Sequence, residues 1–146
     1  MTRLEKSIEI MESPEKIWLY LCGEGITEWY PNIRSHEFTS EKRGLGAIYH
    51  VAGEGDDQKF EYNAIVTEYV ENERVGWRTT SGDWTAFGSI TLKPIVAGTV
   101  VMYMIDYALP YSLLGMIIDR LRVSKSMREG LETALKNLKK LVEEEK

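Results

Sequence analysis

Residues 127–142 read MREGLETALKNLKKLV, and their apolar side chains recur at steps of three and four residues. Such spacing places the apolar side chains along one face of an α-helix. The resulting apolar stripe consists of Met127, Leu131, Ala134, Leu135, Leu138, Leu141 and Val142. A stripe of this length needs a large apolar surface to cover it. The sequence therefore predicts a long C-terminal helix packed against a sheet.

Most of the chain before this helix alternates between apolar and polar residues, which is the pattern of half-buried β-strands. The last of these stretches, residues 99–109, reads TVVMYMIDYAL and leads into the apolar segment 110–118. Residue types that favour turns separate the stretches from one another. We expect strands over residues 4–10, 33–41, 45–53, 58–70, 74–80, 84–92 and 99–109.

Two short helices are expected between the first two strands. Residues 13–15, Ser-Pro-Glu, supply a capping side chain, a proline at the first helical position and an acid near the positive end of the helix dipole. The glycines within residues 23–25 end this helix, and a second short helix over residues 26–30 ends at Pro31. The predicted fold is therefore α+β: a curved antiparallel sheet of seven strands around a long C-terminal helix.

The composition fits one globular domain over residues 1–146 that buries its own core. Hydrophobic residues make up 43% of the chain, an ordinary value for such a domain. The N-terminal residues carry no apolar signal sequence, and no apolar run approaches the roughly 20 residues of a membrane span. The single cysteine, Cys22, excludes an internal disulfide. We expect a cytoplasmic protein whose contact with membranes is at most transient.

The predicted inward face of the sheet is unusually aromatic. A packed core favours Leu, Ile and Val, whereas Tyr and Trp need a partner for their polar atom. A cavity that holds a ligand with a few polar groups would supply one, although the same rings could simply fill the core. The predicted ligand-binding residues are Trp29, Tyr62, Trp77, Trp84, Tyr103 and Tyr107.

The order of these elements resembles the START-like helix-grip superfamily (SRPBCC), and within it the polyketide cyclase/dehydrase and lipid-transport group. The segments that carry the resemblance are SPEKIW at 13–18, VTEY at 66–69, RVGW at 74–77, GTVV at 98–101 and NLKKL at 137–141. The resemblance implies an apolar cavity between the sheet and the C-terminal helix. Members bind sterols, lipids, polyketides, plant hormones or quinones, and a minority catalyse cyclisation or dehydration. The group has no universal catalytic residue.

The sequence is compatible with three functions. The first is binding or carriage of a small hydrophobic or amphipathic ligand, and the second is a cyclase or dehydratase that uses the same cavity. The third is an interaction module or homodimer whose contact surface lies on the outer face of the sheet, at Phe87, Val100, Met102 and Met104. The net charge of -5 argues against a nucleic-acid partner. No cofactor is expected.

An enzyme of this kind would need an acid or base within reach of its substrate. The candidate side chains are those of His36, His50, Asp106, Tyr62, Tyr103 and Tyr107. The strand that carries His50 could present either face to the cavity, because glycines precede it. Alternation places Asp106 opposite Tyr107, so we expect Asp106 to be solvated. Two well-separated histidines and one cysteine make a metal site improbable.

Residues 110–128 are expected to form a mobile gate with a basic rim. The cations Arg120, Arg122, Lys125 and Arg128 gather there in an otherwise acidic chain. Cations near the start of a helix oppose its dipole, so their placement suggests another benefit, such as attraction of an anionic group. The alternative is an ordinary exposed helix face.

Overall fold

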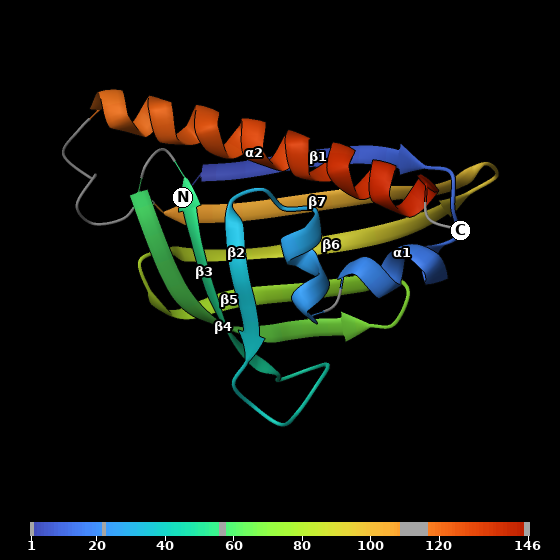
Figure 1. Cartoon of the computed structure of the whole chain (residues 1–146), viewed down its shortest axis with the longest axis horizontal. Helices are drawn as coiled ribbons and strands as arrows, with labels where there is room; N and C mark the ends of the chain where they lie inside the picture. The colour runs from blue at the N-terminus through green and yellow to red at the C-terminus, as the bar shows by residue number, and fades with distance from the viewer. Residues whose placement is uncertain (1, 22, 56–57, 109–116, 145–146) are drawn as a thin grey trace.

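The computed structural model describes residues 2–21, 23–55, 58–108 and 117–144. A sheet of seven strands, in the order β1-β7-β6-β5-β4-β3-β2, curves around one long helix (Figure 1). Every neighbouring pair of strands is antiparallel. The predicted α+β helix-grip fold is therefore confirmed.

The elements follow the predicted order. The strands are β1 (Thr2–Ile10), β2 (Ile33–Phe38), β3 (Ile48–Gly55), β4 (Gln58–Val70), β5 (Arg74–Gly82), β6 (Thr85–Ile95) and β7 (Gly98–Ala108). The helices are α1 (Pro14–Leu21), the short 3₁₀-helix η1 (Gly23–Glu28) and α2 (Ile117–Glu144). In the described residues, no helix is both long enough and apolar enough to cross a membrane.

Several element boundaries differ from the prediction by two or more residues, and two of these differences have local backbone reasons. The second helix begins at Gly23, because the chain continues from α1 into a tight 3₁₀ turn, a common form for short connections. Strand β3 begins at Ile48 and not at residue 45. Gly44 and Gly46 have φ angles of 76° and 84°, in the left-handed region that suits glycine, so the chain turns there and cannot be extended.

Helix α2 buries the stripe predicted from its sequence. Leu131, Ala134, Leu135, Leu138 and Val142 are buried, and Met127 and Leu141 pack at the margin of the same core. This core also contains side chains from β1, β6, β7 and α1. Figure 1 shows α2 lying along β1, with α1 and η1 on the same side of the sheet.

A second, smaller core lies on the other half of the sheet. It contains Ile33, Ala47, Tyr49, Val51, Ala64 and Val66, from β2, β3 and β4 and the turn before β3. The same partly buried side chains, Ile26, Tyr30, Val75 and Trp77, pack against both cores. The boundary between the two cores is therefore part aliphatic, at Ile26 and Val75, and part aromatic, at Tyr30 and Trp77.

Asp106 departs from its predicted environment. Its side chain points away from the cavity as expected, but the residue is only 6% exposed and not solvated. The antiparallel register places Arg3 directly opposite, and Arg3 Nε and Nη2 each lie 3.1 Å from a carboxylate oxygen of Asp106. The hydrogen bond to Asp106 raises the pKa of Arg3. Arg3 on the neighbouring strand therefore covers this carboxylate. The alternation of residues within β7 alone does not predict such a cross-strand contact.

Candidate ligand-binding site

A cavity of about 540 Å³ lies between the sheet and α2. We call it the main cavity. Val123, Met127 and Gly130 of α2 line one side of it, and strands β4 to β7 line the other. Its aromatic lining residues are Tyr30, Phe60, Tyr62, Trp77, Trp84, Tyr103 and Tyr107. A volume of this size falls within the range typical of small-molecule sites.

Three of these rings form a row of nearly parallel planes. Phe60 and Tyr62 are two residues apart on β4 and lie on the same face of the strand. Their ring centroids are 6.2 Å apart, and their planes differ by 9°. Trp77, on neighbouring β5, continues the row, at 6.4 Å and 17° from Tyr62. Trp84 and Tyr107 add an edge-to-face pair, with centroids 5.9 Å apart. The main cavity is therefore lined by flat, polarisable surfaces suited to an apolar molecule.

The charged residues that line the main cavity are exposed to solvent. Gln58 and Lys59 begin β4, Asp83 lies between β5 and β6, and all three are exposed. Asp83 Oδ2 accepts a hydrogen bond of 2.9 Å from the Glu61 backbone N–H. The charges of the described lining thus lie at the mouth, while the interior is aromatic and uncharged.

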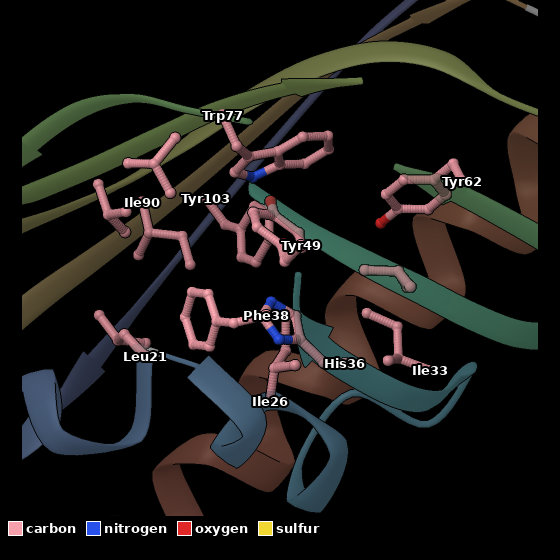
Figure 2. Close-up of a pocket in the computed structure, with 13 residues that line it drawn as sticks. Leu21, Ile26, Ile33, His36, Phe38, Tyr49, Tyr62, Trp77, Ile90 and Tyr103 are labelled. Atoms are coloured by element: carbon pink, nitrogen blue, oxygen red, sulfur yellow. The ribbon is translucent and has the colours of Figure 1, made fainter. Parts of the chain in front are cut away.

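A smaller pocket of about 70 Å³ adjoins the main cavity (Figure 2). We call it the inner pocket. Leu21 of α1 and Ile26 of η1 cover it, and His36 lies in its wall. The two spaces share the lining residues Ile33, Tyr62, Trp77 and Tyr103. Figure 2 shows the Tyr62 hydroxyl pointing toward the middle of the inner pocket.

Four tyrosines around these spaces are strongly desolvated. Burial raises the pKa of Tyr30, Tyr49, Tyr62 and Tyr103 well above the ordinary phenol value of 10. Among the described residues, none accepts or donates a hydrogen bond at the hydroxyls of Tyr30, Tyr62 or Tyr103. These hydroxyls therefore stay neutral over the physiological pH range and can donate to a polar group of a ligand.

The raised pKa values predict a loss of stability in alkali. Above pH 10 the unfolded chain releases phenol protons that the folded chain retains, so the free energy of unfolding falls as pH rises. Below pH 10 the tyrosines are protonated in both the folded and the unfolded chain, so they cause no loss of stability there. Near-ultraviolet absorbance of the native protein should therefore show that four of its eight tyrosines ionise only as the fold is lost. Simultaneous ionisation of all eight in the folded protein would contradict this assignment.

The family of the chain follows from its whole length. A family model described as "Polyketide cyclase / dehydrase and lipid transport" matches residues 1–143. The chain belongs to this family. The resemblance drawn from the sequence motifs is thus confirmed. Among curated proteins, none matches the chain in sequence.

Solved structures share the fold at low sequence identity. A Thermus thermophilus protein has a TM-score of 0.82 at 22% identity, over 97% of both chains. The Zhui aromatase/cyclase of a Streptomyces species has a TM-score of 0.81 at 12% identity, over 97% of this chain and 93% of its own. A START superfamily protein from Mycobacterium smegmatis has a TM-score of 0.79 at 19% identity, over 97% of each chain. At such identities these likenesses establish the fold alone.

Five of the six predicted ligand-binding residues line the main cavity of this polyketide cyclase/dehydrase and lipid-transport family member: Tyr62, Trp77, Trp84, Tyr103 and Tyr107. Their contact with a ligand stays a prediction. Trp29 does not line either space in the described structure. It is 1% exposed, and its Nε1 donates a 2.9 Å hydrogen bond to the Tyr20 carbonyl.

The position of Trp29 has a clear physical cause. Its own carbonyl accepts a 3.1 Å hydrogen bond from Asn137 Nδ2 of α2, so the turn after η1 is tied beneath that helix. Its ring packs edge-on against Tyr103, with centroids 6.3 Å apart. Trp29 thus packs against Tyr103, which lines the main cavity, without lining the cavity itself.

His36 is more buried than the alternation of its strand predicts. Strict alternation from Ile33 would turn Ser35 inward and His36 outward. A β-bulge between Ile33 and Ser35 shifts the register of β2 against β3, and His36 becomes buried while Phe38 joins it in the inner pocket. A bulge of this kind leaves little signal in a single sequence.

His50 lies on the opposite face of the sheet from both spaces. Its neighbours Tyr49 and Val51 are buried and line the inner pocket, so alternation directs His50 outward. There its Nε2 lies 3.4 Å from Glu61 Oε2. Within the described residues, no three His, Cys, Asp or Glu side chains gather in an arrangement that could hold a metal ion.

The predicted gate divides into two parts. Residues 110–116 lie outside the described residues, as does the side chain of Arg120, whereas residues 117–128 belong to α2. Arg122, Lys125 and Arg128 are exposed on that helix, and Lys125 Nζ lies 4.0 Å from Glu129 Oε1. Attraction of an anionic group to these cations stays a prediction.

The outer sheet face keeps some of its predicted apolar exposure. Phe87 is 41% exposed and Met102 is 42% exposed, while Val100 and Met104 are half-buried. Scattered exposed apolar residues are normal on protein surfaces. A homodimer through this face stays a prediction.

Proposed function

We propose that this protein binds and carries a small, neutral, apolar or amphipathic molecule in the main cavity. One observation carries the proposal: a cavity of about 540 Å³ whose interior is aromatic and whose only charged described lining residues, Lys59 and Asp83, are exposed at its mouth. The hydrophobic effect favours entry of an apolar molecule into such a space. The neutral tyrosine hydroxyls provide donors for a few polar groups.

The family supports this proposal at a coarser level. Its description joins polyketide cyclases and dehydrases with lipid transport, and a cavity for a hydrophobic molecule suits each of these roles. We propose that residues 1–146 form one domain around that cavity. We also propose a cytoplasmic protein, since a single cysteine suits a compartment where thiols stay reduced.

A cyclase or dehydratase is the second candidate. General acid–base catalysis needs a titratable side chain beside the reacting atoms. The described lining of the main cavity offers phenols inside and charges only at the mouth, which favours binding over turnover. His36 in the inner pocket is the observation that keeps the enzyme candidate. Loss of water from a bound polyketide-like substrate would establish it.

The neutral dye Nile red tests the proposed function. We expect saturable binding with one dye per chain, accompanied by quenching of tryptophan fluorescence, because Trp77 and Trp84 line the main cavity. A long-chain alcohol should displace the dye. Replacing the cavity residue Trp84→Phe should reduce the quenching more than replacing the core residue Trp18→Phe. Dye uptake that never saturates, with no displacement by the alcohol, would contradict a defined cavity site.

A further inference from the structure

His36 is placed in the inner pocket by the bulge in β2. The residue is only 9% exposed, although histidine is usually found closer to the surface. Side chains from α1, η1 and the six strands β2 to β7 surround the same space. In Figure 2 the imidazole lies among Phe38, Tyr49 and Ile26. The imidazole is thus a polar group, beside the tyrosine hydroxyls, in a pocket whose other lining side chains are largely apolar.

Aromatic neighbours fix the orientation of this imidazole. The Tyr49 ring stacks on it, with centroids 4.3 Å apart and planes 19° apart. The Phe38 ring meets it edge-on at 5.5 Å. A ring held between two others presents its nitrogens in a fixed direction, which is a requirement for a specific hydrogen bond.

The inner pocket is a continuation of the main cavity. Tyr62, Trp77 and Tyr103 line both spaces, so a molecule in the main cavity that passes these rings reaches His36. A volume of about 70 Å³ has room for a few non-hydrogen atoms and not for a second ligand. The inner pocket therefore fits one end group of a molecule whose body fills the main cavity.

We propose that the inner pocket is a subsite for a neutral hydroxyl or carbonyl group at one end of the bound molecule, and that the His36 imidazole is its hydrogen-bonding partner. A neutral imidazole offers one donor and one acceptor nitrogen, which suits a hydroxyl through either atom and a carbonyl through the donor. This inference rests on the proposed function, because it assumes that the main cavity holds the rest of the molecule.

The surroundings favour a neutral end group over a carboxylate. The described lining of the inner pocket contains no Lys, Arg, Asp or Glu. Burial of a carboxylate without a cation costs far more free energy than burial of a hydroxyl that is hydrogen-bonded. The raised pKa values of Tyr49, Tyr62 and Tyr103 show the same low polarity, because they reflect a penalty on negative charge.

Three matched probes test this subsite: naphthalene, 2-naphthol and 2-naphthoate. The chain has two histidines, so ¹⁵N-labelling of histidine gives two sets of ring signals, which a His50→Gln variant assigns. At neutral pH we expect 2-naphthol to shift the His36 ring nitrogens and leave those of His50 unchanged. Naphthalene should leave both unchanged. This measurement uses the natural chain and requires no substitution at the buried position.

Affinities measured by calorimetry provide the second readout. We expect 2-naphthol to bind about tenfold more tightly than naphthalene, the effect of one added hydrogen bond, and 2-naphthoate to bind more weakly than 2-naphthol. The variant His36→Phe keeps an aromatic ring and should abolish the preference for 2-naphthol while leaving the affinity for naphthalene within about twofold. The variant His50→Phe, on the outer face, should retain the preference.

The outcomes separate the two proposals. If the natural protein binds none of the three probes and no Nile red, the proposed function fails. If naphthalene and 2-naphthol bind equally and the His36 signals stay unchanged, binding in the main cavity stands and the His36 subsite is wrong. If 2-naphthoate binds most tightly and shifts the His36 signals, the inner pocket takes an anion and the inference of a neutral group is overturned.

Discussion

Deletion of residues 130–146 is expected to abolish cooperative unfolding of the protein. The deleted segment carries most of the apolar stripe of α2, including Leu131, Leu135 and Leu138. These side chains share one core with β1, β6, β7 and α1, so their loss would expose the sheet face that they cover. Circular dichroism during thermal or chemical denaturation measures the result. A truncated chain that still unfolds in one sharp transition would contradict the packing described above.

A single substitution gives the same test in graded form. Leu138 is fully buried, and Leu138→Ala should lower the free energy of unfolding by about 2–5 kcal/mol, through lost burial and the cavity left behind. The matched control is Leu19→Ala on α1, where the side chain is 76% exposed and the expected change is within about 0.5 kcal/mol. Equal effects of the two substitutions would show that α2 contributes little to the core.

The periodic part of the fold could be predicted because burial imposes its spacing on the sequence. Helix α2 shows this most clearly: Leu131, Leu135 and Leu138 are buried where their three- and four-residue steps place them. The same argument predicted Tyr62 on β4 and Tyr103 on β7 as inward-facing residues, and both line the main cavity. In a regular helix or strand the same spacing of buried residues recurs several times, so it can be recognised in the sequence.

The rest of the site depends on contacts between segments far apart in the sequence. Trp29 is held beneath α2 by Asn137, and Asp106 is covered by Arg3 from the neighbouring strand. Neither contact produces a periodic pattern in the sequence. His36 depends on one bulge in β2, and a one-residue shift moves a strand side chain from one face to the other. The sequence therefore predicts the cavity more fully than the polar group at its deep end.

Filling the main cavity from its wall should remove ligand binding without unfolding the protein. Ala86 is a small residue of β6 that lines the main cavity and lies opposite Tyr107 of β7. Its backbone N–H donates a 3.0 Å hydrogen bond to Thr79 Oγ1, so its place in the sheet does not depend on its methyl group. In Ala86→Trp, the added indole would enter the space that the ligand needs.

The expected loss of affinity follows from the cost of crowding. Forcing extra groups into a filled site costs about 1–3 kcal/mol, so Nile red should bind about tenfold to hundredfold more weakly to Ala86→Trp. The emission of the dye itself is the appropriate signal, because the variant gains a tryptophan. The melting temperature should stay close to that of the natural protein, since the indole buries apolar surface in a cavity and not in a packed core.

The control is Thr85→Trp, which adds an indole at the exposed neighbouring residue of the same strand. Alternation directs this side chain to the outer sheet face, away from the main cavity, so dye affinity should be unchanged. Weaker binding in both variants would indicate a general effect on β6. Unchanged binding in Ala86→Trp, with Thr85→Trp also unchanged, would mean that the dye occupies another part of the molecule. Only loss of binding confined to Ala86→Trp agrees with a ligand held between the sheet and α2.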